Sequence, residues 1–176
     1  NTEPDALHAL LDKLTTVLIH WLRMQLDAGA DAFQVFDSWA DALAPMDYRA
    51  FALPYLHRIF DALRPMGKPA ILFSKDAGAF VEENHRLPIE VLAMDWRVNL
   101  ASIRDHYRGI GPAAYQGNLD PLVLLGKQDI LFEKAGKILS ENAGMPGYIF
   151  NLGHGITPAT PVDNVRALVD FVHGYR

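Results

Sequence analysis

Apolar residues follow two different spacings along the chain. From Leu7 to Leu26 they recur at helical spacing, with Thr2 as a candidate N-cap and Gly29 as the stop. Five short runs then appear that are mainly apolar rather than alternating, each bounded by turn residues, at 33–36, 70–73, 90–94, 113–116 and 148–151. Runs of this kind are typical of strands that are buried on both faces of a parallel sheet.

Helical segments separate these five runs. We expect helices at about 45–64, 78–85, 99–108, 128–140 and 160–172, with Asn99 and Thr160 as N-caps. Pro54 predicts a break in the first of them, because proline lacks the N–H that a helix interior requires. Alternating strands and helices with short loops predict parallel strands joined by right-handed crossovers.

Two α/β architectures fit this alternation, a doubly wound open sheet and a (β/α)8 barrel. A barrel needs eight strands and about 250 residues. The chain has 176 residues, so on this pattern alone it is either an open sheet or part of a barrel. It starts without a methionine, directly at an expected helix cap, which hints that an upstream part is missing.

Composition narrows the classes of function. Half of the residues are hydrophobic and 21% are charged, as in soluble globular proteins. The net charge of −5 gives no basic field for nucleic acid or an anionic membrane. No apolar run approaches the roughly 20 residues that span a bilayer. The chain has no cysteine, which excludes disulfides, thiolate metal sites and a thiol nucleophile and fits a cytoplasmic location.

Polar residues gather immediately after the predicted strands. They occupy residues 37–39, 74–78, 95–97, 117–121 and 152–155. The connections that lead from helices into strands, such as 67–69 and 109–112, carry mainly turn residues. In both architectures ligands bind at the C-terminal ends of the strands. The asymmetry therefore predicts a ligand site at that end of the sheet.

Among these residues His154 is the best candidate for a functional role. A glycine on each side lets its backbone approach a ligand, and a histidine can bind anionic groups or relay a proton. Asp95 and Asp120 are expected to cap helices or bind loop amides, and for Asp37 that reading stays open beside a catalytic one. Ser38 lacks the flanking glycines of a hydrolase elbow, and no phosphate-loop, dinucleotide or zinc-protease motif occurs.

Five segments along the chain carry distinctive motifs. They are residues 29–40 with Asp37-Ser38-Trp39, residues 47–55 with the internal Pro54, Met94-Asp95-Trp96, residues 115–121 (Tyr-Gln-Gly-Asn-Leu-Asp-Pro) and residues 150–156 (Phe-Asn-Leu-Gly-His-Gly-Ile). In order along nearly the whole chain, these segments resemble the uroporphyrinogen decarboxylase family. Residues 29–40 resemble the strand and loop that carry the family's substrate-binding Ser or Thr, and residues 47–55 resemble the helix that follows. The other three resemble its Leu-Asp-Trp strand end and its Leu-Gln-Gly-Asn-Leu-Asp-Pro and Asn-Leu-Gly-His-Gly motifs.

The resemblance implies a (β/α)8 TIM-barrel family. Residues 1–176 would then be a single partial domain, a C-terminal portion of about five strand-helix units. It also implies a homodimer that removes the four acetate carboxylates of uroporphyrinogen III, giving coproporphyrinogen III in porphyrin and heme biosynthesis, without metal or organic cofactor. By the same resemblance, Ser38 would bind a substrate carboxylate, Phe36 would line the cavity against the macrocycle, and His154 would contact a carboxylate or pyrrole.

The family's carboxylate-binding Arg loop, its Asp for the pyrrole N–H groups and a Tyr all lie upstream of the matched segment. No catalytic residue is therefore assignable here, and we expect the chain alone to be inactive and poorly stable, with exposed strand edges. One alternative is a non-catalytic remnant that binds a porphyrinogen or a partner. Another is a relative of the cobalamin-dependent methyltransferases, which is disfavoured because their zinc site takes a cysteine ligand.

Overall fold

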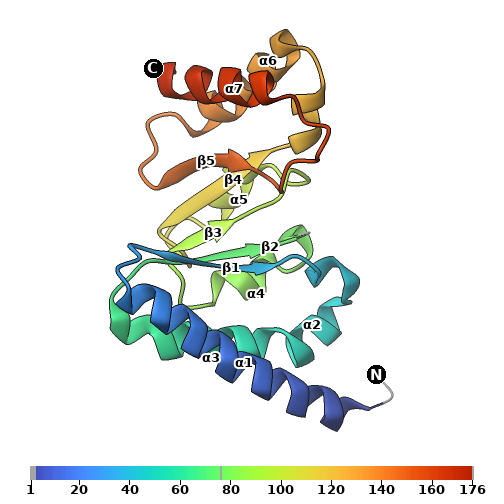
Figure 1. Cartoon of the computed structure of the whole chain (residues 1–176), viewed down its shortest axis with the longest axis vertical. Helices are drawn as coiled ribbons and strands as arrows, with labels where there is room; N and C mark the ends of the chain where they lie inside the picture. The colour runs from blue at the N-terminus through green and yellow to red at the C-terminus, as the bar shows by residue number, and fades with distance from the viewer. Residues whose placement is uncertain (1–2, 76, 176) are drawn as a thin grey trace.

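A computed structural model describes residues 3–75 and 77–175 as an α/β fold (Figure 1). The strands are β1 (Phe33–Asp37), β2 (Ala70–Ser74), β3 (Val91–Ala93), β4 (Ala114–Leu119) and β5 (Tyr148–Leu152). The α-helices are α1 (Pro4–Asp27), α2 (Pro45–Phe51), α3 (Leu53–Leu63), α4 (Val81–His85), α5 (Leu100–His106), α6 (Gln128–Asn142) and α7 (Val162–Gly174). Short 3-10 helices are η1 (Ala40–Ala42), η2 (Arg64–Met66), η3 (Ala77–Ala79) and η4 (Pro121–Leu125).

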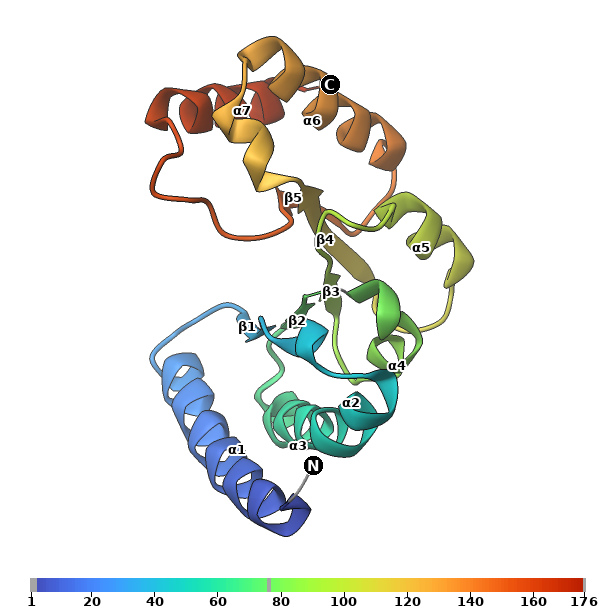
Figure 2. The same ribbon diagram turned by 90° about the vertical axis from the view of Figure 1, so that its right-hand side faces the viewer.

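The strands pair in the order in which they occur in the sequence, β1-β2-β3-β4-β5, and every pair is parallel. A doubly wound sheet would reverse its order at a switch point and place helices on both faces. Here each right-handed crossover advances in the same direction, so the helices cover one face. Figure 2 shows them as an arc around the sheet. The sheet is thus that of a partial TIM barrel.

The sheet is curved strongly enough for side chains of non-adjacent strands to meet. Gln34 on β1 and Gln116 on β4 approach to 3.4 Å between the amide nitrogen of Gln116 and the amide oxygen of Gln34. In a flat sheet these two strands would lie about 14 Å apart, because neighbouring strands are spaced by about 4.8 Å. The contact across two intervening strands is therefore evidence of barrel-like curvature.

The hydrophobic core lies between the convex face of the sheet and the helices. Its larger cluster joins Leu72 and Leu92 of the sheet to Phe60 and Leu63 of α3. A smaller, separate cluster packs α6 and α7 against the ends of β4 and β5.

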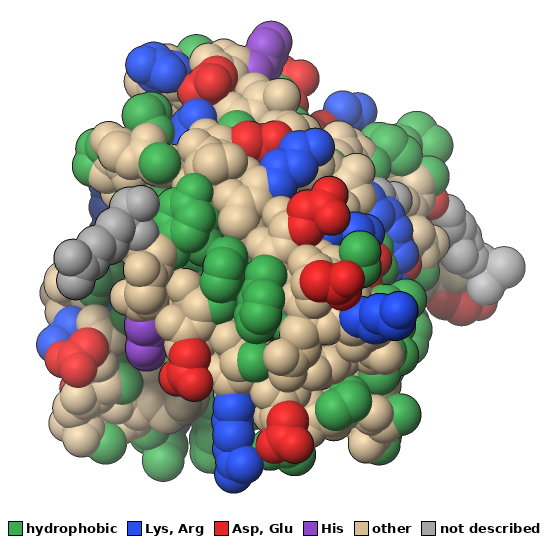
Figure 3. Space-filling view, turned by 90° about the horizontal axis from the view of Figure 1, so that it is seen from above, with side chains coloured by type: hydrophobic (Ala, Val, Ile, Leu, Met, Phe, Trp, Pro, Cys, Tyr) green, Lys and Arg blue, Asp and Glu red, His purple; other side chains and the backbone are tan. Residues whose placement is uncertain are grey.

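On the surface at the α6 and α7 end, the described Lys and Arg side chains lie among Asp and Glu side chains (Figure 3). No described helix has both the length and the apolar composition needed to cross a membrane.

The predicted helix boundaries are largely confirmed. The helix expected at 45–64 breaks at Ala52, and Pro54 lies in the first turn of α3. The Asn99 side chain caps α5 by accepting a hydrogen bond from the Ser102 amide at 2.8 Å. The prediction for Thr160 is wrong, because α7 begins at Val162 with Pro161 in the cap position, in extended conformation. The expected cap at Thr2 lies outside the described residues.

The fourth strand is longer than the sequence predicts. It continues through Gly117, Asn118 and Leu119, which pair with β5, although the apolar run ends earlier. Asn118 is buried and donates hydrogen bonds to the carbonyls of Asp95 and Val98, at 2.8 Å each. A polar residue can thus occupy a buried strand because it ties β4 to the loop after β3.

Candidate functional site

A cavity of about 450 Å³ opens on the concave face of the sheet, toward the C-terminal ends of the strands. It is lined by Gln34, Phe36, Ser38, Phe73, Ala93, Met94, Gln116, Asn151, Leu152, His154 and Gly155. All three side chains that the sequence suggested for substrate binding are in this lining, from β1, the loop after β1 and the loop after β5. The structure therefore brings together residues that are far apart in the sequence.

Phe36 and Phe73 form an aromatic wall of this cavity. The two residues are register partners on β1 and β2, and their ring centroids are 5.8 Å apart. Phe73 is only 5% exposed, whereas Phe36 is 65% exposed. A large aromatic side chain held this open on a strand offers apolar surface to a ligand. The imidazole of His154 stands edge-on to Phe73 with centroids 6.0 Å apart.

Two contacts hold the loop that carries Ser38: a hydrogen bond from the Trp39 backbone to Asp37, and the ion pair between Lys75 and Asp41. Burial raises the pKa of the Asp37 carboxyl, which also hydrogen-bonds the backbone of Trp39. Lys75 pairs with Asp41 at 2.8 Å, and its ammonium stands 5.8 Å from the centroid of the Trp39 ring. Asp37 does not line the cavity, and its contact with the loop backbone favours a structural role.

The loop that carries His154 depends on the glycine before it. A Cβ on Gly153 would lie 2.5 Å from the backbone nitrogen of Trp96, so no larger residue fits without a shift. The Gly153 amide also donates to the Leu119 carbonyl at 2.7 Å. A Cβ on Gly155, by contrast, would meet nothing within 4 Å. Of the two flanking glycines, Gly153 thus serves a close contact within the protein, and only Gly155 faces open space.

The loop after β3 supports His154 from the side. The Trp96 ring stands edge-on to the imidazole, with centroids 6.2 Å apart, and the Arg97 guanidinium lies 4.4 Å from the centre of the Trp96 ring. Asp95 is fully buried and accepts hydrogen bonds from the Arg97 amide at 2.9 Å and its guanidinium at 2.8 Å. These contacts confirm the loop-binding role expected for Asp95.

Asp120 also has the structural role that the sequence suggested. It occupies the N-cap of η4, and its carboxylate accepts a hydrogen bond from the Leu122 amide at 2.9 Å. This bond satisfies an amide at the start of the helix that has no partner within the helix. Neither Asp95 nor Asp120 lines the cavity around Phe36.

Sequence reasoning missed the three polar cavity residues Gln34, Gln116 and Asn151, because it searched only the segments that follow the strands. These residues lie within β1, β4 and β5. A polar residue inside an otherwise apolar strand was the available signal, as in Phe-Gln-Val-Phe. Among the described residues, no three His, Cys, Asp or Glu side chains lie close enough together to hold a metal ion.

A family model described as uroporphyrinogen decarboxylase (URO-D) matches residues 1–175. The chain belongs to the uroporphyrinogen decarboxylase family. A relative of that name from Syntrophotalea carbinolica is 49% identical over 170 residues, which are 97% of this chain and 49% of the relative. A second, from Geobacillus kaustophilus, is 46% identical over 173 residues, or 98% of this chain and 49% of the relative.

The family assignment confirms the resemblance read from the strand-end segments. The partial barrel seen here agrees with it, because uroporphyrinogen decarboxylases are TIM barrels. The chain spans about half the length of the curated relatives it matches.

Proposed function

We propose that this chain forms the C-terminal, substrate-binding part of a uroporphyrinogen decarboxylase. The reaction would convert the four acetate side chains of uroporphyrinogen III into methyl groups, giving coproporphyrinogen III, with the assembled protein acting as a homodimer. The observation that carries the proposal is the cavity at the strand ends, where an aromatic wall adjoins Ser38 and His154. Membership of the family supports the same chemistry.

The proposed chemistry needs an electron sink for each acetate that is lost. A proton added to a pyrrole carbon makes the ring cationic, and the electron pair of the breaking carbon–carboxylate bond then neutralises that charge as CO2 leaves. A proton taken up by the exocyclic carbon, with loss of the first proton from the ring, completes the methyl group. The residues of this chain would bind and orient the substrate: Ser38 donates to a carboxylate, Phe36 packs on the macrocycle, and His154 contacts a carboxylate or pyrrole.

Exposed apolar surface supports the proposal that residues 1–176 are a partial domain of a larger barrel. The outer face of α1 carries Leu10, Leu14, Val17 and Trp21, each between 49% and 64% exposed. In the described sheet β1 pairs only with β2, and β5 only with β4, so both end strands have an open edge. We therefore expect the chain alone to be inactive and of low stability.

A second candidate function is binding without catalysis. The cavity at the strand ends would hold a porphyrinogen, or the exposed apolar face of α1 would meet a partner subunit, and no reaction would follow. Binding of uroporphyrinogen III without its decarboxylation would identify this second function.

The test is anaerobic decarboxylation of uroporphyrinogen III by this chain alone and after co-expression with the N-terminal half of the Syntrophotalea carbinolica relative. We expect activity only in the assembly. Ser38→Ala and His154→Ala should each reduce kcat/KM by roughly 10- to 100-fold, as expected for a lost hydrogen bond to a charged group. The exposed Ser140→Ala and His173→Ala are matched controls. An assembly that binds the substrate without turnover would favour the binding function, and unchanged Ser38 and His154 variants would refute both site assignments.

A further inference from the structure

Two glutamine side chains form the floor of the cavity. Gln34 projects from β1 and Gln116 from β4, and they meet on the concave face at 3.4 Å. Gln116 is only 6% exposed. Bulky branched apolar residues usually fill the inner face of such a barrel, and a buried amide is costly unless its hydrogen bonds are made. Gln116 is buried and Gln34 is half-buried, so both amides need polar partners.

The contact between the two amides leaves groups free to bind a ligand. One amide donates to the carbonyl oxygen of the other, so the pair as a whole retains one NH₂ group and one carbonyl group for further hydrogen bonds. This holds whichever way round the two amides are oriented. The pair therefore offers a neutral donor and a neutral acceptor at the bottom of the cavity.

The cavity wall has little charge of its own. His154 is the only residue in the described lining with a readily ionised side chain. Asn151 accepts a hydrogen bond from the Leu152 amide at 2.8 Å, which leaves its own NH₂ group as a donor. With Ser38, the lining thus combines several neutral donors and has no carboxylate that would repel an anion.

We propose that Gln34 and Gln116 form a subsite that binds a carboxylate side arm of the ligand by neutral N–H donation. The inference rests on the proposed function, which supplies a macrocycle with several carboxylate arms. The macrocycle packs on Phe36 near the mouth, and one arm reaches down between the strands to the glutamine pair. Because the subsite is neutral, it distinguishes an arm by its length and its acceptor atoms rather than by ion pairing.

The experiment uses the assembly of this chain with the N-terminal half of the Syntrophotalea carbinolica relative and measures the Kd for uroporphyrinogen III under anaerobic conditions, together with kcat. Gln116→Met keeps the side-chain volume but removes the donor, and we expect a roughly tenfold rise in Kd. Gln116→Glu adds a negative charge beside the carboxylate arm, and we expect a roughly hundredfold rise. Gln128→Met at the exposed start of α6, outside the cavity lining, is the matched control and should leave Kd unchanged.

Which of the two Gln116 variants has the higher Kd identifies the ligand group that the glutamines bind. A Gln116→Glu variant that binds as well as Gln116→Met, or better, would mean that the glutamines meet a pyrrole N–H, and it would overturn the subsite. A Gln116→Met variant with the Kd of the unmodified assembly would also overturn it. If the unmodified assembly binds uroporphyrinogen without decarboxylating it, the proposed function fails while the subsite is still judged by these values. Absence of any binding would refute both.

Discussion

The two faces of the sheet use neighbouring residues of the same strands for different purposes. On the convex face, Leu72 of β2 and Leu92 of β3 are fully buried beneath the helices. On the concave face, Phe36 of β1 is 65% exposed beside the cavity. Successive side chains of a strand point to opposite faces. A shift of one position along a strand thus changes a residue from one that packs in the core to one that faces the cavity.

The largest expected effect is the difference in stability between two alanine variants, one on each face of the sheet. Leu72→Ala removes a fully buried side chain, and we expect it to lower the free energy of unfolding by about 2–5 kcal/mol. Phe36→Ala should change it by less than about 1 kcal/mol, since most of that ring is exposed. Urea denaturation of the two variants measures both values. Equal losses of stability would show that the two faces do not differ in this way.

The glycines beside His154 provide a smaller and more local comparison. Gly153→Ala forces a Cβ to within 2.5 Å of the Trp96 nitrogen, and we expect a cost of about 1–3 kcal/mol from the backbone shift. Gly155→Ala has open space around the new methyl group and is the matched control. Thermal melts of the two variants test the difference. If Gly155→Ala were the more damaging substitution, the close contact would not explain the need for glycine.

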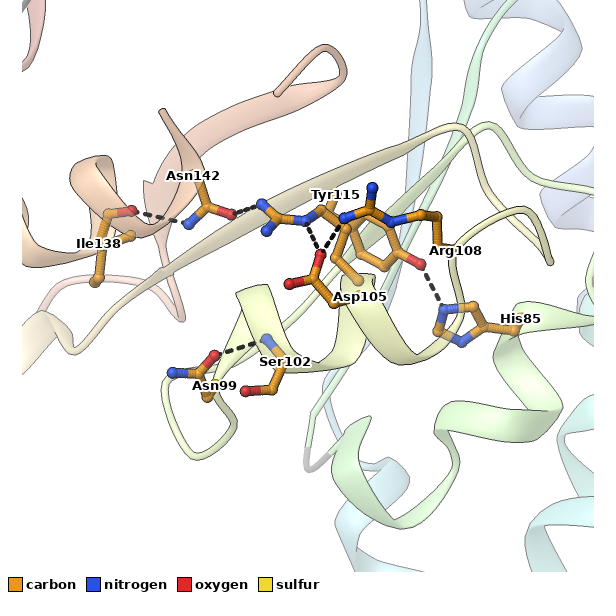
Figure 4. Close-up of polar contacts among 9 residues, drawn as sticks. His85, Asn99, Ser102, Asp105, Arg108, Tyr115, Ile138 and Asn142 are labelled. Carbon is orange, nitrogen blue, oxygen red and sulfur yellow. Dashed lines mark hydrogen bonds and ion pairs between the residues drawn. The ribbon is translucent and has the colours of Figure 1, made fainter. Parts of the chain in front are cut away.

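On the convex side, a buried histidine should make stability depend on pH. His85 is 3% exposed. Its Nε2 lies 2.8 Å from the Tyr115 hydroxyl (Figure 4). Its Nδ1 lies 2.6 Å from the Val81 carbonyl, and its ring stacks on Tyr107 at 4.0 Å between centroids. Nδ1 therefore donates, and Nε2 accepts from the tyrosine. Burial is the main cause that lowers the pKa of His85, and the nearby His106 adds to it.

Because the pKa of His85 is lowered in the folded protein, acid should destabilise the fold. Below the ordinary histidine pKa of about 6.5 the unfolded chain binds a proton that folded His85 does not, so stability falls as the pH decreases through that region. Urea denaturation at pH 7.5 and pH 5.5 should show the loss, and His85→Gln should make it smaller. A stability that rose on acidification, with the same slope in the variant, would contradict the assignment.

The smallest predicted effect concerns the start of α5. Asn99→Ala removes the hydrogen bond from the Ser102 amide, drawn in Figure 4, and should cost about 1 kcal/mol. Asn99→Ser keeps a neutral capping oxygen beside the Glu141 carboxylate and should cost much less. Chemical denaturation of both variants measures the difference. Equal destabilisation by the two changes would mean that the cap contributes little.

The sequence predicted those parts of the fold and site that depend on local pattern. The Asn99 cap was predictable because capping needs only neighbouring residues. Phe36, Ser38 and His154 were expected from the resemblance of their strand-end segments, and the structure places all three in the lining of one cavity, while their roles in binding stay predictions. Gln34 and Gln116 were missed because their meeting depends on the curvature of the sheet, which involves residues far apart in the chain. The extension of β4 was missed for a related reason, since Asn118 is buried only through its bonds to the loop after β3.

The central claim is that the concave face binds substrate and the convex face maintains the fold, and one pair of neighbouring residues tests it most directly. Phe36→Ala and Val35→Ala would be compared in the assembly with the N-terminal half of the relative, by anaerobic decarboxylation and by thermal melting. We expect Phe36→Ala to lower kcat/KM at least about tenfold with little change in Tm. Val35 packs against the larger core cluster, so its variant should lower Tm and keep kcat/KM within about twofold. The opposite result, with activity lost at Val35 and stability lost at Phe36, would contradict the account.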